Sequence, residues 1–138
     1  MQLMSKLLAA YITTLLTMVL IDLVWLGVIA RPWYLQGIGH LMAERPNVPV
    51  AVLFYAVFAL GLMVFAVAPQ SSVPGWRASA AAAAMFGFFC YATYDLTNLA
   101  TLKNWPIWLA ALDMAWGVLV SVASAVAGKA VLDRWPFS

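Results

Sequence analysis

Four long hydrophobic runs, separated by short polar stretches, make up most of this 138-residue chain. They cover Leu7–Ala30, Val50–Ala68, Ala78–Leu99 and Ile107–Gly128. A helix needs about 20 predominantly apolar residues to cross the hydrocarbon core of a bilayer, and each run comes close to that length or exceeds it. The pattern predicts an all-α membrane protein in which residues 1–138 form one domain, with four transmembrane helices in an antiparallel bundle.

Prolines mark the ends of these runs, and the only long connection joins the first run to the second. Pro32 follows the first run and Pro49 precedes the second; proline suits the first turn of a helix and interrupts its interior. The connection contains Trp33 and Tyr34, aromatic residues of the kind enriched at membrane interfaces. We expect a short interfacial helix over about Pro32–Ala43, or a lid formed by the same segment.

Composition narrows the class of protein further. Hydrophobic residues make up 66% of the chain and mean hydropathy is +0.95, whereas soluble domains are roughly 45 to 50% apolar. A net charge of +2 with 9% charged residues gives no basic surface for nucleic acid, so we expect membrane lipids as partners. The single Cys90 excludes an internal disulfide, and His40 has no His or Cys nearby; we therefore expect no metal and no cofactor.

Basic residues near the ends of the runs indicate an orientation. One side of a four-span arrangement carries Lys6, Arg77, Lys129 and Arg134, and the other carries Arg31, Arg45 and Lys103. Cytoplasmic loops are enriched in Lys and Arg. The charges favour a multi-pass membrane protein with both termini in the cytoplasm.

Three of the hydrophobic runs contain one interior aspartate each: Asp22, Asp95 and Asp113. At about 1.5 Å of rise per residue, each lies about 24 to 27 Å from the basic residue at the cytoplasmic end of its helix, in the outer third of a core about 30 Å thick. Aspartate at the centre of a membrane helix costs about 2.5 to 3.5 kcal/mol, so such a side chain usually faces a partner or a cavity. No Lys or Arg lies within the spans, and we expect the three carboxyl groups to converge and to hold protons.

Aromatic and polar side chains at the same depth complete the candidate site. We expect its residues to be Asp22, Trp25, Tyr55, Tyr91, Tyr94, Asp95, Asn98, Asp113 and Trp116. The two tryptophans follow Asp22 and Asp113 by three residues on oppositely running helices, so one indole is expected above the carboxyl groups and one below. The alternative interpretation is an ordinary interfacial belt of aromatics, with Asp95 and Asn98 as the polar end of a helix.

Small residues at four-residue spacing predict which helices lie closest together. Such spacing allows membrane helices to approach closely. The third and fourth predicted helices carry it beneath their aspartates, at Ser79, Ala83 and Gly87 and at Gly117, Ser121 and Ala125. These two helices are expected to form the tightest pair.

Three segments carry a resemblance to a known family: YATYDLTNLATLKNWP at Tyr91–Pro106, IDLVWLG at Ile21–Gly27, and Asp113–Gly117. Together they resemble a bacterial family of small four-span inner-membrane proteins known only as a domain of unknown function. The similarity covers nearly the whole chain. It implies a helical membrane fold and a compartment, and very little chemistry.

Three classes of function fit these residues. The leading hypothesis is a pocket that binds or transports a lipid-like or amphipathic small molecule, with the aspartates exchanging protons or pairing with a cation. The second is an enzyme acting on a lipid or isoprenoid chain with one aspartate as general acid, although no nucleophile–base pair accompanies it. The third is an accessory subunit of a larger membrane complex. Separately from these functions, the sequence leaves a homo-oligomer open. The sequence does not decide whether the protein is an enzyme.

Overall fold

Helices form almost the whole of the computed structural model, which describes residues 1–135. The longer elements are α1 (Gln2–Val24), α3 (Val48–Leu62), α4 (Arg77–Thr101) and α5 (Ile107–Asp133), and the short α2 (Arg31–Ile38) follows α1. Wider π-helical turns continue two of them: η1 (Trp25–Ile29) follows α1, and η3 (Met63–Val67) follows α3. Single 3-10 turns follow α2, as η2 (Gly39–Leu41), and η3, as η4 (Ala68–Gln70). The expected connection helix is therefore present, but its α-helical part ends at Ile38, before the predicted Ala43.

Three helical stretches within residues 1–135 are long and apolar enough to cross a membrane: Gln2–Ile29, Val48–Gln70 and Ile107–Asp133. This confirms a multi-pass membrane protein. The prediction of four such spans is corrected, because Ala78–Leu99 forms a helix, α4, that is not apolar enough to qualify. Its C-terminal third carries Thr93, Asp95 and Asn98, and polar side chains of this kind lower the hydropathy of a segment whatever its depth.

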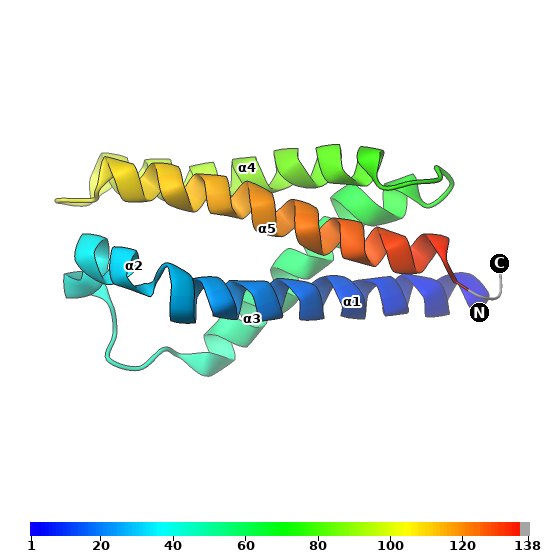
Figure 1. Cartoon of the computed structure of the whole chain (residues 1–138), viewed down its shortest axis with the longest axis horizontal. Helices are drawn as coiled ribbons and strands as arrows, with labels where there is room; N and C mark the ends of the chain where they lie inside the picture. The colour runs from blue at the N-terminus through cyan, green and yellow to red at the C-terminus, as the bar shows by residue number, and fades with distance from the viewer. Residues whose placement is uncertain (136–138) are drawn as a thin grey trace.

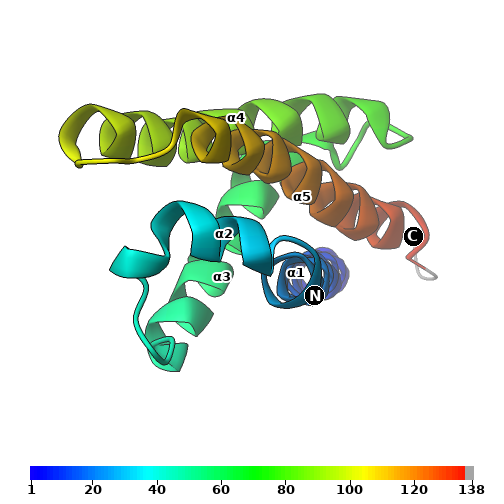
Figure 2. The same ribbon diagram turned by 60° about the vertical axis from the view of Figure 1, so that its left-hand side comes forward.

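The arrangement departs from a regular bundle in the position of α3. Helices α1, α4 and α5 lie side by side along most of their length, with α5 running opposite to the other two, whereas α3 crosses obliquely (Figures 1 and 2). Helix α4 packs against α5 and η3, while α3 itself lies mainly against α1. The N-terminal half of α3 therefore diverges from α4, and this divergence leaves space between the helices at the α2 end of the molecule.

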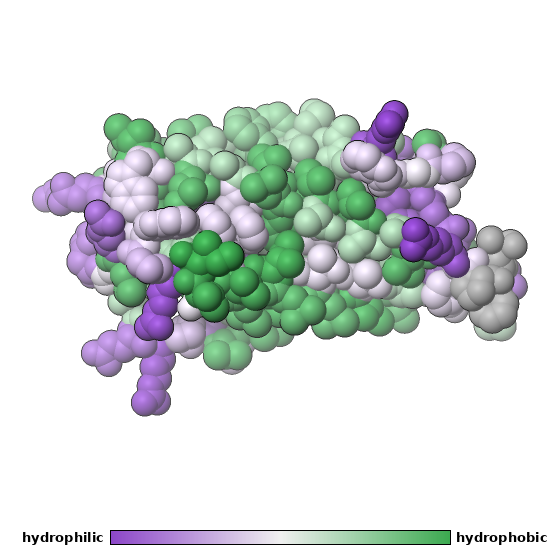
Figure 3. Space-filling view, viewed as in Figure 1, coloured by the Kyte–Doolittle hydropathy of each residue, from purple (hydrophilic) through white to green (hydrophobic). Residues whose placement is uncertain are grey.

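Hydrophobic residues cover the middle of the molecular surface, and hydrophilic residues gather at its two ends (Figure 3). One end carries the start of α1, the start of α4 and the end of α5; the other carries α2 and the loop between α4 and α5 (Figure 1). The exposed side chains of the middle section include Leu16, Leu53, Phe89 and Leu119, each more than half exposed. An apolar surface of this kind is expected to contact the hydrocarbon core of a bilayer rather than water.

The predicted close pairing of the third and fourth long helices is confirmed. Helices α4 and α5 make the most extensive contact in the molecule. A methyl group added at Gly87 would come 2.5 Å from the carbonyl oxygen of Gly117, and Ser79, Ala83, Ser121 and Ala125 are fully buried. The small side chains thus allow the two backbones to touch, which maximises van der Waals contact where lipid supplies no hydrophobic drive.

At the opposite end from α2, a buried lysine ties the loop before α4 to α5. The ammonium of Lys129 is fully buried, donates to the carbonyl oxygen of Val73 at 2.8 Å and pairs with Asp133. Asp133 also accepts a bond from the backbone N–H of Gly75, at 3.2 Å. A buried charge is tolerated only when it is paired and hydrogen-bonded, so this cluster is structural.

Candidate functional site: a pocket of carboxylates and aromatic rings

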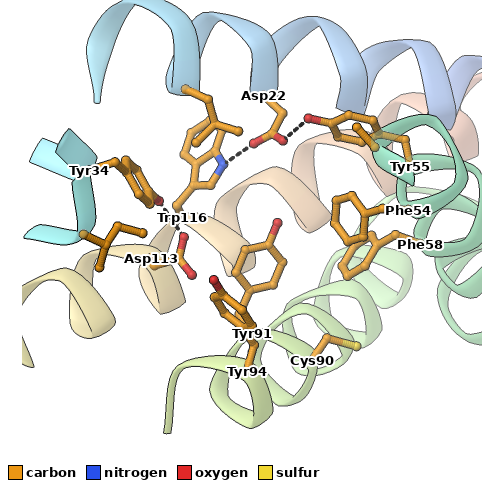
Figure 4. A pocket seen from close by; sticks show the side chains of 13 residues that line it. Asp22, Tyr34, Phe54, Tyr55, Phe58, Cys90, Tyr91, Tyr94, Asp113 and Trp116 are labelled. Atoms are coloured by element: carbon orange, nitrogen blue, oxygen red, sulfur yellow. Dashed lines mark hydrogen bonds between the residues drawn. The ribbon is translucent and has the colours of Figure 1, made fainter. Parts of the chain in front are cut away.

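A pocket of about 510 Å³ lies where α3 diverges from α4. All five α-helices and η1 contribute to its wall (Figure 4). The lining residues are Asp22, Leu26, Tyr34, Ile38, Ala51, Phe54, Tyr55, Phe58, Cys90, Tyr91, Tyr94, Asp113 and Trp116. The volume falls in the range of about 300 to 1,000 Å³ typical of small-molecule sites, which are also mostly apolar with a few placed polar groups.

Asp22, on α1, is held by donors from two other helices. Its carboxyl group is 4% exposed and accepts hydrogen bonds from the Tyr55 hydroxyl at 2.5 Å and from Trp116 Nε1 at 2.8 Å. Tyr55 is on α3 and Trp116 on α5, so this one carboxyl group joins α1 to both.

Asp113, on α5, is held from the connection between α1 and α3. Its Oδ1 accepts a hydrogen bond from the Tyr34 hydroxyl at 2.5 Å, and that hydroxyl oxygen accepts from Trp25 Nε1 at 3.3 Å. Burial of the phenol, and then the neighbouring Asp113 carboxylate, raise the pKa of Tyr34 above its ordinary value of 10. Tyr34 therefore stays protonated and remains a donor. Helix α2 forms part of the pocket wall through Tyr34 and Ile38.

The two tryptophans stack on each other, which corrects the expectation that they lie above and below the carboxyl groups. Their ring centroids are 4.4 Å apart and their planes differ by 6°. Trp116 bonds to Asp22, whereas Trp25 reaches Asp113 through Tyr34. Each indole thus serves the aspartate of the opposite helix. In each segment the tryptophan lies about one helical turn beyond the aspartate. Because the two helices are antiparallel, each tryptophan comes close to the aspartate of the other helix.

Asp95, on α4, lies behind the pocket wall. It is 1% exposed, does not line the pocket, and faces the carboxyl group of Asp113 and the indole of Trp105. Neither of its oxygens has a hydrogen-bond partner with good geometry, and Trp105 Nε1 is likewise buried without one. Trp105 covers this side by packing edge-on against Tyr94, at 5.8 Å and 84°. The preceding Asn104, with φ of 61°, makes the left-handed turn that asparagine tolerates.

The structure brings most of the expected site residues together. Those that line the pocket are Asp22, Tyr55, Tyr91, Tyr94, Asp113 and Trp116, and those that do not line it are Trp25, Asp95 and Asn98. The principal residue that the sequence prediction missed is Tyr34, which was assigned to the headgroup level. Phe54, Phe58 and Cys90 also line the pocket. Aromatic spacing along α3 is the only sequence signal that points to Phe54 and Phe58.

Within residues 1–135, no group of three or more His, Cys, Asp or Glu side chains is arranged to hold a metal ion. Fold and site together define a small, multi-pass helical membrane protein with a pocket whose polar groups are carboxyls, phenols and indoles. A family model described as "Predicted membrane protein (DUF2177)" matches residues 7–130, and the chain belongs to this family. No curated protein and no solved structure matches the chain.

Proposed function

We propose that the pocket binds an amphipathic, lipid-like molecule with a positively charged head. The head would lie at Asp113 and Asp22, and the hydrocarbon part along Phe54, Phe58 and Leu26. The observation that carries this proposal is the chemistry of the lining: two buried carboxyl groups, and no Lys, Arg or His among the lining residues. An anionic head would meet like charge, whereas a cation would be attracted by the carboxylates.

The aromatic walls support the same choice of head group. Tyr91 and Trp116 line the pocket beside the two aspartates (Figure 4). The faces of aromatic rings attract cations within about 6 Å, and rings around quaternary ammonium groups are a recurring mode of recognition. Asp113 has a hydrogen bond to Oδ1 only, and a carboxylate offers about four lone-pair sites, so it retains the capacity to bind a ligand.

Access from the side of the molecule supports a ligand that partitions into lipid. Phe54 on α3 and Tyr94 on α4 both line the pocket and are 43% and 52% exposed. These residues lie on the two helices that diverge at this end. A hydrocarbon chain would enter between them from the bilayer without crossing the polar end of the molecule.

The placement in the membrane is part of the proposal. We infer that α4 is embedded with the other three long helices, because it packs along α5 and its buried polar residues Asp95 and Ser79 face protein. The charge distribution favours both termini in the cytoplasm, and the resemblance to bacterial inner-membrane proteins favours the inner membrane. The pocket would then lie in the outer third of the bilayer.

Thermal unfolding of the purified chain in a non-ionic detergent tests the proposal. Dodecyltrimethylammonium and dodecanoate have matched chain lengths and opposite charges. The cation is expected to raise the melting temperature and the anion is not. Asp113→Asn should abolish the rise, whereas Glu44→Gln, which removes a carboxylate from an exposed loop, should keep it. Equal stabilisation by both probes, or an unchanged response in Asp113→Asn, would overturn the proposal.

A further inference from the structure

Two carboxyl groups on neighbouring helices face each other beside the pocket. Asp113 is 8% exposed and lines the pocket, while Asp95 is 1% exposed and lies behind it. Asp95 interacts with Asp113, yet neither of its oxygens has a hydrogen-bond partner with good geometry. Asp95 is therefore a buried carboxyl group that interacts with another carboxyl group and has no hydrogen-bond partner among the described residues. Buried polar atoms without partners call for an explanation.

The surroundings of this pair contain no positive charge to neutralise it. The titratable groups that face it are Tyr34 from α2 and both Tyr91 and Tyr94 from α4, and Trp105 contributes a neutral indole. The only salt bridge among the described residues involves Lys129, at the opposite end of the bundle. Two adjacent carboxylates without a cation cannot both ionise easily, and such pairs share a proton.

We propose that Asp95 and Asp113 hold one proton between them when the pocket is empty, and that a cationic head group binding at Asp113 displaces it. This inference rests on the proposed function and adds proton exchange to it. The charges balance: the pair carries one negative charge with its proton, and after exchange two negative charges with one bound cation. The net charge inside the low-dielectric site is the same in both states, which makes the exchange favourable compared with either event alone.

The two aspartates have different roles in this exchange. Asp113 is open to the pocket and would contact the ligand. Asp95 is sealed from the other side by Trp105, which is 8% exposed and packs against Tyr94. The displaced proton would therefore leave through the pocket, past Asp113 and the Tyr34 hydroxyl. Asp95 does not contact the ligand and is a positioning residue that shares the proton with Asp113 while the pocket is empty.

Calorimetry with a probe that carries no proton of its own tests the inference. Dodecyltrimethylammonium would be titrated into the purified full chain at one pH in two buffers of different ionisation enthalpy. We expect about one proton released per cation bound, and an affinity that rises about tenfold per pH unit across the range where the pair holds its proton, as linkage requires. In Asp95→Asn, binding should persist with little proton release and little pH dependence; in Glu44→Gln both should match the unmodified chain.

Each outcome has a distinct meaning. Binding without proton release in the unmodified chain overturns the exchange and leaves the proposed function standing. Absence of binding overturns both. Release that persists in Asp95→Asn removes Asp95 from the exchange. Because the two-buffer comparison on the unmodified chain decides the main question, the test does not depend on how well the variant folds.

Discussion

Replacing Gly87 by alanine adds a single methyl group at the closest approach of α4 and α5. An ideal Cβ at this position would lie 2.5 Å from the carbonyl oxygen of Gly117 and 2.3 Å from Ser121 Oγ. Attractive contacts between heavy atoms lie at about 3.5 Å, so the two backbones would have to separate locally by about 1 Å. The carbonyl oxygen belongs to the backbone of α5 and cannot rotate away as a side chain would.

The expected magnitude follows from two opposing effects. Overpacking a tight contact costs about 1 to 3 kcal/mol, while changing glycine to alanine gains about 0.4 to 1 kcal/mol by reducing the entropy of the unfolded chain. We expect Gly87→Ala to lower the free energy of unfolding by about 1 to 2 kcal/mol. Gly27→Ala is the matched control, because outside the adjoining helical backbone no described atom lies within 4 Å of the added methyl group. It should be neutral or slightly stabilising.

Equilibrium unfolding of the detergent-solubilised chain, followed by far-ultraviolet circular dichroism, would measure both variants. Gly87→Leu should be more destabilising than Gly87→Ala, since the larger side chain forces a wider separation. If Gly87→Ala is as stable as Gly27→Ala, the two helices do not approach as closely as described, and the argument from small residues fails.

Two further predictions concern the polar network and the orientation. Tyr55→Phe removes one of two donors to Asp22, which is 4% exposed; it should lower the free energy of unfolding by about 1 to 3 kcal/mol, because a buried acceptor loses its donor. Tyr11→Phe, which removes a bond to a backbone carbonyl oxygen across the same two helices, should cost about 0.5 to 1.5 kcal/mol. Equal losses in an unfolding titration would show that Asp22 is not the stronger acceptor. A reporter fused after Ser138 should be active in the cytoplasm, and periplasmic activity would reverse the proposed orientation.

The long helices and the close pairing of α4 with α5 could be predicted from the sequence, because both depend on the local pattern of residues. The length of an apolar run against the thickness of a bilayer predicts a helix that spans it, and small residues spaced by one turn line one face of that helix. Gly87 and Gly117 therefore identified the α4–α5 contact before any tertiary information. The same reasoning overestimated α4 as an apolar span, because the length of the run was counted without weighing the polar residues near Asp95.

The sequence also placed Asp22 and Asp113 at one end of the molecule, since rise per residue fixes depth along a helix. Only the tertiary structure decided which side chains donate hydrogen bonds to these two carboxyl groups. The oblique course of α3 opens the pocket, and the fold of the connection brings Tyr34 to Asp113 across 79 positions of sequence. Depth along a helix is a local property, whereas helix tilt and loop conformation result from packing of the whole chain. The place of α2 in the pocket wall and the divergence of α3 from α4 therefore could not be predicted from the order of residues.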